Sequence, residues 1–226
     1  MKKAFLAGCA LLCLAALVPA AGCSKKVDLT DYVSEYRSDI YMGTEGDYSV
    51  FASVSFREYP YVADGNAGET QQLFEVTLSV PDNTKTYSIG FSYGNVSKQA
   101  ELSFDSVIMV HTWSESLPAP TEKEIDFTIT CEEEESEPVT VRAASVKTEN
   151  VLSLGKLLET VSAQESERFS ALTSEHTFLG ELYVRLLSEA EDCFYYIGLT
   201  DRNVKTFSML CDAENGEVIA TKEQQQ

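Results

Sequence analysis

The chain has 226 residues, 44% of them hydrophobic, and its 36 Asp and Glu outnumber its 17 Lys and Arg, so the formal net charge is −19. A chain this acidic lacks the cations that would replace counterions along a phosphate backbone, which excludes nucleic acid as a partner. Its hydrophobic content is sufficient for one or two small cores, which excludes disorder of the whole chain.

The first 22 residues have the organisation of an export signal. Lys2 and Lys3 precede an apolar run of 15 residues over 4–18, and Pro19 and three small residues follow. This run is shorter than the roughly 20 residues that a membrane-spanning helix needs. We therefore predict that residues 1–22 are a cleaved signal peptide, which leaves a mature chain with a net charge of about −21.

Residues 20–23, with the sequence Ala-Ala-Gly-Cys, resemble the lipobox of bacterial lipoproteins. The resemblance implies that Cys23 receives a diacylglycerol thioether, becomes the new N-terminus and anchors the protein to the extracytoplasmic face of the cell membrane. Residues 23–38 are then a lipidated tether and lead-in segment. Its two lysines, Lys25 and Lys26, would be attracted to anionic lipid headgroups. Two alternatives stay open: secretion after cleavage by ordinary signal peptidase, and an uncleaved anchor.

Apolar and polar residues alternate with period two through residues 39–150, most clearly over 48–57 and 74–80. This alternation is typical of strands with one solvated face. Turn residues separate about eight such strands, which predicts an antiparallel β-sandwich with an immunoglobulin-like outline. The cysteine and tryptophan spacing of true immunoglobulin domains is missing, so the prediction concerns architecture alone.

Beyond residue 150 the period changes to that of a helix. Apolar-face residues recur every three or four positions, namely Phe169, Leu172, His176, Leu179, Tyr183, Leu186 and Ala190. With Ser162 and Glu165 as a capping box, they predict one long helix. Strands over 193–199, 204–211 and 217–222 follow as a three-stranded antiparallel meander. We therefore predict an α+β, mostly β chain: a β-sandwich over 39–150, and a long helix packed on the meander over 151–226.

This C-terminal part is similar to cystatin-like and PepSY-type modules, in which a helix packs on a curled antiparallel sheet. The segment 212–220 resembles the Asp-x-x-x-Gly-Glu-Val hairpin that ends many PepSY repeats. The resemblance implies binding or restraint of an extracellular peptidase, but assigns no residue to that role. As a whole the chain also resembles the uncharacterised sandwich lipoproteins of Gram-positive bacteria.

Four cysteines remain after cleavage, and two of them lie in the predicted meander. A three-residue loop over 201–203 sets Cys193 opposite Cys211 across the hairpin, so a disulfide there is one prediction and two buried thiols are the other. With Cys23 lipidated, the cysteines are too sparse for a zinc cage, and we predict no metal site.

No catalytic group stands out in the sequence. His111 and His176 lack a motif that would give either a partner, and carboxylate pairs are expected by chance among 36 acids. The acidic run 132–137 is interpreted as a solvated loop, with Ca²⁺ binding as the alternative. Tyrosines crowd the first 93 residues, and Tyr59, Pro60 and Tyr61 form the best candidate binding loop.

These observations predict a non-enzymatic, membrane-anchored extracytoplasmic lipoprotein that acts as a binding or interaction module in the cell envelope, without a cofactor. Its partners would be the membrane, through Cys23, and an envelope protein or glycan. One alternative is a solute- or glycan-binding lipoprotein whose tyrosine-rich sandwich carries the site. Others are a PepSY-like regulator of an extracellular peptidase and a hydrolase that uses carboxylates.

Overall fold

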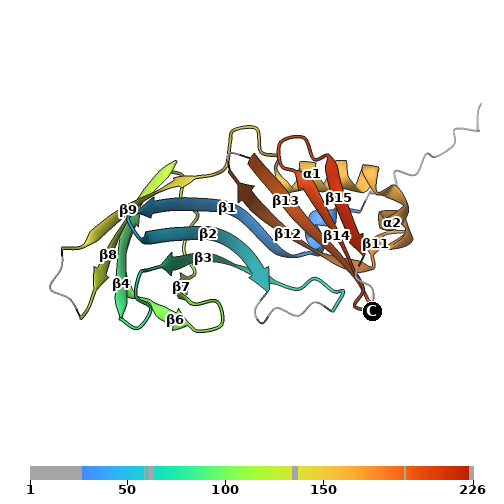
Figure 1. The fold of residues 1–226 in the computed structure, drawn as a ribbon. Helices are drawn as coiled ribbons and strands as arrows, with labels where there is room; N and C mark the ends of the chain where they lie inside the picture. Colours follow the sequence, from blue (N-terminus) through green and yellow to red (C-terminus); the bar gives the residue numbers. More distant parts are fainter. Residues whose placement is uncertain (1–26, 59, 61–63, 134–136, 191, 224–226) are drawn as a thin grey trace, which may run out of the picture.

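The computed structural model describes residues 27–223 except 59, 61–63, 134–136 and 191. Most of this part is strand, and thirteen strands join one continuous sheet (Figure 1). The helical elements are short: the 3-10 turn η1 (Leu29–Tyr32) and the helices α1 (Leu154–Gln164) and α2 (Ser166–Ala171). None of the helices in the described part has the length and hydrophobicity needed to span a bilayer.

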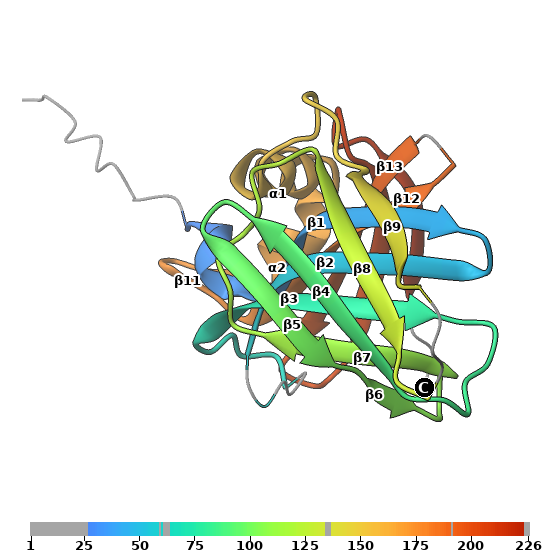
Figure 2. The ribbon, with the colours of Figure 1, turned by 90° about the vertical axis from the view of Figure 1, so that its left-hand side faces the viewer.

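Nine strands of the sheet form a first unit that curls around its own core. Their order is β6-β7-β3-β2-β1-β9-β8-β4-β5. The bounds are β1 (Val33–Glu45), β2 (Tyr48–Glu58), β3 (Thr70–Ser79), β4 (Tyr87–Tyr93), β5 (Val96–Glu101), β6 (Ser103–Asp105), β7 (Val110–Glu115), β8 (Glu124–Cys131) and β9 (Val139–Ser145). Figure 2 shows β4, β5, β8 and β9 crossing in front of β1, β2, β3 and β7.

The predicted immunoglobulin-like sandwich is wrong, because the two ends of this order meet. Only Leu102 separates β5, which pairs with β4, from β6, which pairs with β7. Its side chain is 4% exposed and its N–H donates to the carbonyl of Tyr87 at 2.9 Å. The chain therefore turns at Leu102, inside the core, and passes from the β4–β5 pair to the β6–β7 pair. This connection leaves the antiparallel sheet nearly closed.

The core of the first unit is aromatic. Phe91 lies at its centre, with its ring 5.3 Å from Phe74 and 5.4 Å from Phe127. His111 also lies in this core, 1% exposed, with its ring 5.0 Å from that of Tyr87. Neither His111 nitrogen has a hydrogen-bond partner among the described residues, and burial lowers its pKa. His111 is therefore a neutral packing residue.

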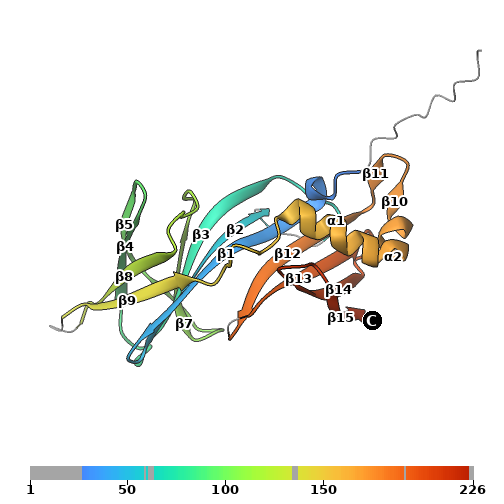
Figure 3. The same ribbon diagram turned by 90° about the horizontal axis from the view of Figure 1, so that it is seen from above.

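A second unit extends the same sheet from the first half of β1. Here β12 (Gly180–Glu189) runs parallel to β1, and β13 (Asp192–Asp201), β14 (Thr206–Asp212) and β15 (Val218–Glu223) follow antiparallel. Figure 3 shows α1 and α2 along one face of these strands. A short hairpin of β10 (Thr173–Ser174) and β11 (Thr177–Phe178) links α2 to β12.

The long helix predicted over this region is also wrong. Helix α1 begins after Ser153 and ends before Glu165, and residues 180–189 are a strand instead. Leu182, Val184 and Leu186 are fully buried, which is the period of two that a strand requires. The opposite face of β12 also carries some apolar residues. Apolar residues three or four positions apart can therefore be found in the same segment, and these gave the helical prediction. Pairing with β1 and β13 on both sides decides for the strand.

The meander strands lie where the alternation predicted them, but their register is different. Tyr195 pairs with Cys211, and Ile197 with Met209, two residues away from the predicted pairing. The turn is longer than predicted because Asp201 Oδ1 accepts hydrogen bonds from two backbone N–H groups further along it. A shift of two residues keeps every side chain on its face, so the apolar face still meets the helices.

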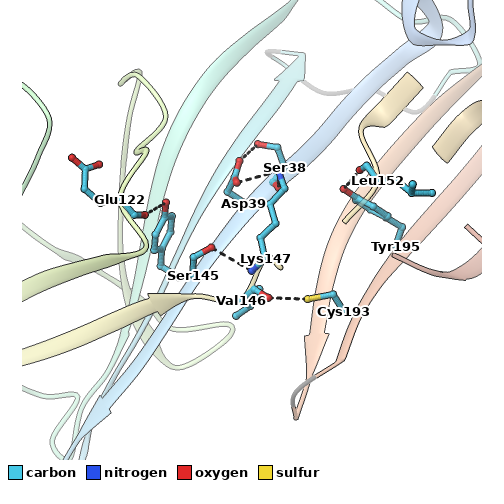
Figure 4. Close-up of polar contacts among 10 residues, drawn as sticks. Ser38, Asp39, Glu122, Ser145, Val146, Lys147, Leu152, Cys193 and Tyr195 are labelled. Atoms are coloured by element: carbon cyan, nitrogen blue, oxygen red, sulfur yellow. Dashed lines mark hydrogen bonds and ion pairs between the residues drawn. The ribbon is translucent and has the colours of Figure 1, made fainter. Parts of the chain in front are cut away.

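The two units share β1 and meet at the segment 146–152 (Figure 4). Lys147 Nζ donates to the Ser38 carbonyl and to Asp39 Oδ1, each at 3.3 Å. From the second unit, Cys193 Sγ donates to the Val146 carbonyl at 3.0 Å and the Tyr195 hydroxyl to that of Leu152 at 3.1 Å. The division into domains at residue 150 stays a prediction, and both hydrophobic cores draw on β1.

Candidate functional site: an apolar cleft beside Arg37

In the second unit, α1 and α2 cover one face of the sheet and the other face is free of helices. Side chains on the open face include Leu187 of β12, Phe194 of β13 and Leu210 of β14, all partly buried. Together with Met42 and Phe51 of the first unit, they line a cleft of about 450 Å³ where the two units diverge. This volume lies within the range of about 300–1,000 Å³ typical of ligand pockets.

The sequence builds this cleft by breaking the usual alternation. A half-covered antiparallel sheet normally carries polar residues on its outer face. Here Leu186 faces the core while Leu187 faces out, and Tyr195 faces the core while Phe194 faces out. Leu187 and Phe194 are direct cross-strand partners. Leu187, Phe194 and Leu210 thus form an apolar patch on a face that α1 and α2 do not cover, and such a patch indicates a binding surface.

Arg37 of β1 forms the charged end of the cleft. Its Nε donates to the Leu186 carbonyl at 3.1 Å, and its guanidinium carbon lies 5.7 Å from the Phe51 ring centroid. The register of β1 shifts just after it, between Arg37 and Asp39, an irregularity of the kind that redirects side chains near sites. Arg37 is thereby held against the apolar lining.

Arg37 differs from the other partly buried cations in the described part of the chain. Each of those has a carboxylate oxygen within 4.0 Å, namely Arg57, Lys85, Lys98, Lys147, Arg168 and Arg185. No ion pair of Arg37 is found among the described residues. Burial and the charge of Arg185 lower the pKa of Arg37, against the opposite effect of Glu35 and Glu75. Arg37 stays a cation, since an arginine is not deprotonated in proteins.

One row of residues connects Arg37 to the rest of the open face. In register across the sheet, Arg37 pairs with Arg185, Arg185 with Tyr196, and Tyr196 with Leu210. Arg185 is neutralised by Glu35 through two hydrogen bonds of 2.8 and 2.7 Å. Among the partly buried cations of this face, Arg37 is therefore the one without an ion pair in the described residues.

A second hollow, of about 690 Å³, lies on the outer face of β4, β5 and β8. Its lining is polar, with Ser92, Ser97, Asp126 and Thr128 among its residues. This is the composition expected of an ordinary solvated strand face, and Ser92 and Ser97 already bond to each other at 3.2 Å. We therefore take the smaller apolar cleft as the candidate site.

Several predicted site residues lie outside the described residues. These are Cys23, Tyr59 and Tyr61, whereas Pro60 is described and exposed. Three of the crowded tyrosines are core residues, since Tyr41, Tyr87 and Tyr93 are at most 5% exposed. The abundance of tyrosine in this region therefore reflects packing at those three positions.

The structure places the remaining candidates apart from one another. Cys193 and Cys211 are buried free thiols, and the register that set them opposite each other is wrong. His176 is exposed on the turn between β10 and β11 instead of lying on an apolar helix face. In the acidic run, Glu133 accepts from the Thr86 N–H at 2.9 Å. No group of three or more His, Cys, Asp or Glu among the described residues could hold a metal ion.

Sequence reasoning missed the cleft altogether. Arg37 fell in the lead-in segment 23–38, and Leu187 in the predicted helix. The signal that could have found the cleft is the pair of adjacent apolar residues at 186–187 and again at 194–195, because these give a strand two apolar faces.

No protein-family model matches the chain, and no curated protein matches it significantly.

Proposed function

We propose that the protein is a lipid-anchored, extracytoplasmic binding protein that holds an apolar ligand in the cleft beside Arg37. The observation that carries the proposal is the apolar patch of Leu187, Phe194 and Leu210 on the open face of β12, β13 and β14. Apart from Arg37, the polar groups of the lining are Ser188 and Glu189 at the end of β12. This composition suits retention of a ligand better than acid–base or nucleophilic chemistry, which needs convergent titratable groups.

The anchor in this proposal is the thioether on Cys23. From Cys23 to Val27 the chain can span at most about 14 Å. Val27 packs against the core of the second unit, so this unit would be the one held close to the membrane. A Cys23→Ala protein should leave the membrane fraction and lose diacylglycerol labelling. Unchanged membrane association of that variant would contradict the anchor.

The binding part of the proposal is tested with a neutral apolar dye such as Nile red. The mature chain should raise the dye's fluorescence saturably. Leu210→Gln should weaken binding about tenfold, because it places an amide in the apolar lining. Val107→Gln is the matched control, because Val107 is an apolar residue that is 88% exposed in the turn between β6 and β7 of the first unit. Equal binding by the two variants, or no saturable binding, would contradict the proposed site.

A further inference from the structure

We propose that the ligand of the cleft is a long-chain carboxylic acid, whose carboxylate pairs with Arg37 and whose hydrocarbon chain lies between Phe51, Phe194 and Leu210. This inference rests on the proposed function and adds the chemical class of the ligand. Three observations carry it: the charge left over at Arg37, the chemistry of the lining, and the position of the acids around the cleft.

Acidic residues outnumber basic residues about twofold in this chain. With a net charge of −19, cations are scarce and most partly buried ones are paired with a carboxylate. Arg37 uses Nε on the Leu186 carbonyl, and no hydrogen bond of its two terminal nitrogens is found among the described residues. Those two nitrogens form the fork that binds a carboxylate in bidentate fashion. An anionic head group would supply the partner that the chain itself does not.

The lining of the cleft suits a hydrocarbon chain better than a peptide. The cleft lies on the face of the sheet, where the backbone groups of β12, β13 and β14 are already paired with one another. A peptide lying there would find few partners for its own N–H and C=O groups, which are costly to desolvate. A hydrocarbon chain has no such groups, so it matches a lining of leucine, phenylalanine and methionine side chains.

The acids around the cleft set the direction of the ligand. Arg185 is the register partner of Arg37, and Glu189 lies four residues further along β12, about 13 Å away at the rise of a strand. Asp192 pairs with Glu189 across the hairpin, so this end of the cleft is negative. The acids nearest Arg37, Glu35 and Glu75, are paired with Arg185 and Arg57. Repulsion at the Glu189 end and attraction at Arg37 therefore place the carboxylate at the Arg37 end.

The experiment compares dodecanoate with dodecanol as competitors for the neutral dye on the mature chain, at about pH 8, where a carboxylic acid is ionised. The acid should displace the dye at about a tenfold lower concentration than the alcohol. Arg37→Met should remove this preference, lowering the affinity for the acid about tenfold and leaving that for the alcohol unchanged. Arg37→Lys, which keeps the charge without the fork, should retain part of the preference.

Arg142→Met is the matched control, because Arg142 is an exposed cation of β9 that pairs with Asp126 on the outer face of the first unit. It should behave as the wild type. Equal affinity for acid and alcohol, equal losses for both in Arg37→Met, or stronger displacement by an apolar peptide would overturn the inference while dye binding upholds the proposed function. Failure of the dye itself to bind would overturn the proposed function and the inference together.

Discussion

The two units of this sheet bury their apolar surface in different ways. The first unit curls until its apolar faces meet, and its outer face carries polar residues such as Ser92 and Thr128. The second unit covers one face with α1 and α2 and leaves the other open, although Phe194 and Leu210 lie on it. A closed sheet buries its apolar surface in its own core. A sheet that is covered on one face, but carries apolar residues on both, keeps part of that apolar surface accessible to a partner.

The largest expected effect tests the closed core. Phe127 is fully buried in the first unit, and Phe127→Ala should lower the free energy of unfolding by about 3–5 kcal/mol. Phe194→Ala on the open face should lower it by only about 1 kcal/mol, because that side chain keeps solvent contact. Urea denaturation measures both. Equal losses would show that the open face is packed like a core, and would break the comparison.

A smaller effect is expected where the open face is tightest. A Cβ at Gly198 would come within 1.9 Å of Tyr183 Cζ, so Gly198→Ala must displace that ring. The expected loss of stability is about 1–2 kcal/mol, by the cost of overpacking. In a Tyr183→Ala background the same substitution should cost almost nothing. An undiminished cost in that background would place the strain in the backbone instead.

A pH effect is expected at a contact between the units. Glu181 of β12 is fully buried and accepts hydrogen bonds from the Gly65 N–H at 2.7 Å and the Ser34 hydroxyl at 3.1 Å. Desolvation raises its pKa, with Glu58 and Asp64 adding to the shift. The folded state therefore holds a proton that the unfolded state releases near pH 4.3, so this contribution to stability is lost as pH rises above about 4.3.

Glu181→Gln should remove that part of the pH dependence. Denaturation of both proteins between about pH 4 and pH 7 should show the wild type losing stability relative to the variant as pH rises. A difference that stays constant across this range would mean that Glu181 does not titrate there.

The smallest expected effect concerns the thiols. Cys193 and Cys211 pair with different residues in the sheet, and burial raises the pKa of Cys211 to about 12. Reductant should therefore leave the melting temperature unchanged. Titration of the unfolded mature chain should find three free thiols besides Cys23, those of Cys131, Cys193 and Cys211. A count of one free thiol besides Cys23 would instead support the predicted disulfide between Cys193 and Cys211.

The sequence predicts the strands of the first unit well but not their closure. The alternation over 48–57 corresponds to β2 at Tyr48–Glu58, because local alternation determines which residues can face a core. Closure depends on the bend at Leu102 and on pairing between distant strands, which alternation does not encode. In β12, two partly apolar faces made a helical spacing and a strand spacing equally available, and long-range pairing decided between them.

The candidate site was harder to predict than the strands. An arginine in an acidic chain is expected to form an ion pair, and only the fold shows that Glu35 and Glu75 lie near Arg37 without forming one. The same holds for Leu187 and Phe194, since their outward direction follows from the strand pairing and not from their residue type. A site made by the divergence of two units has no compact sequence motif.

The most direct test of the central claim is a backbone amide NMR map of the mature chain titrated with dodecanoate. We expect progressive shifts confined to the cleft, at Arg37, Leu187, Phe194, Leu210 and their immediate neighbours. The outer face of β4, β5 and β8 should stay unchanged. Shifts centred on that polar face, or no shifts at saturating ligand, would contradict the claim that the open apolar face is a ligand site.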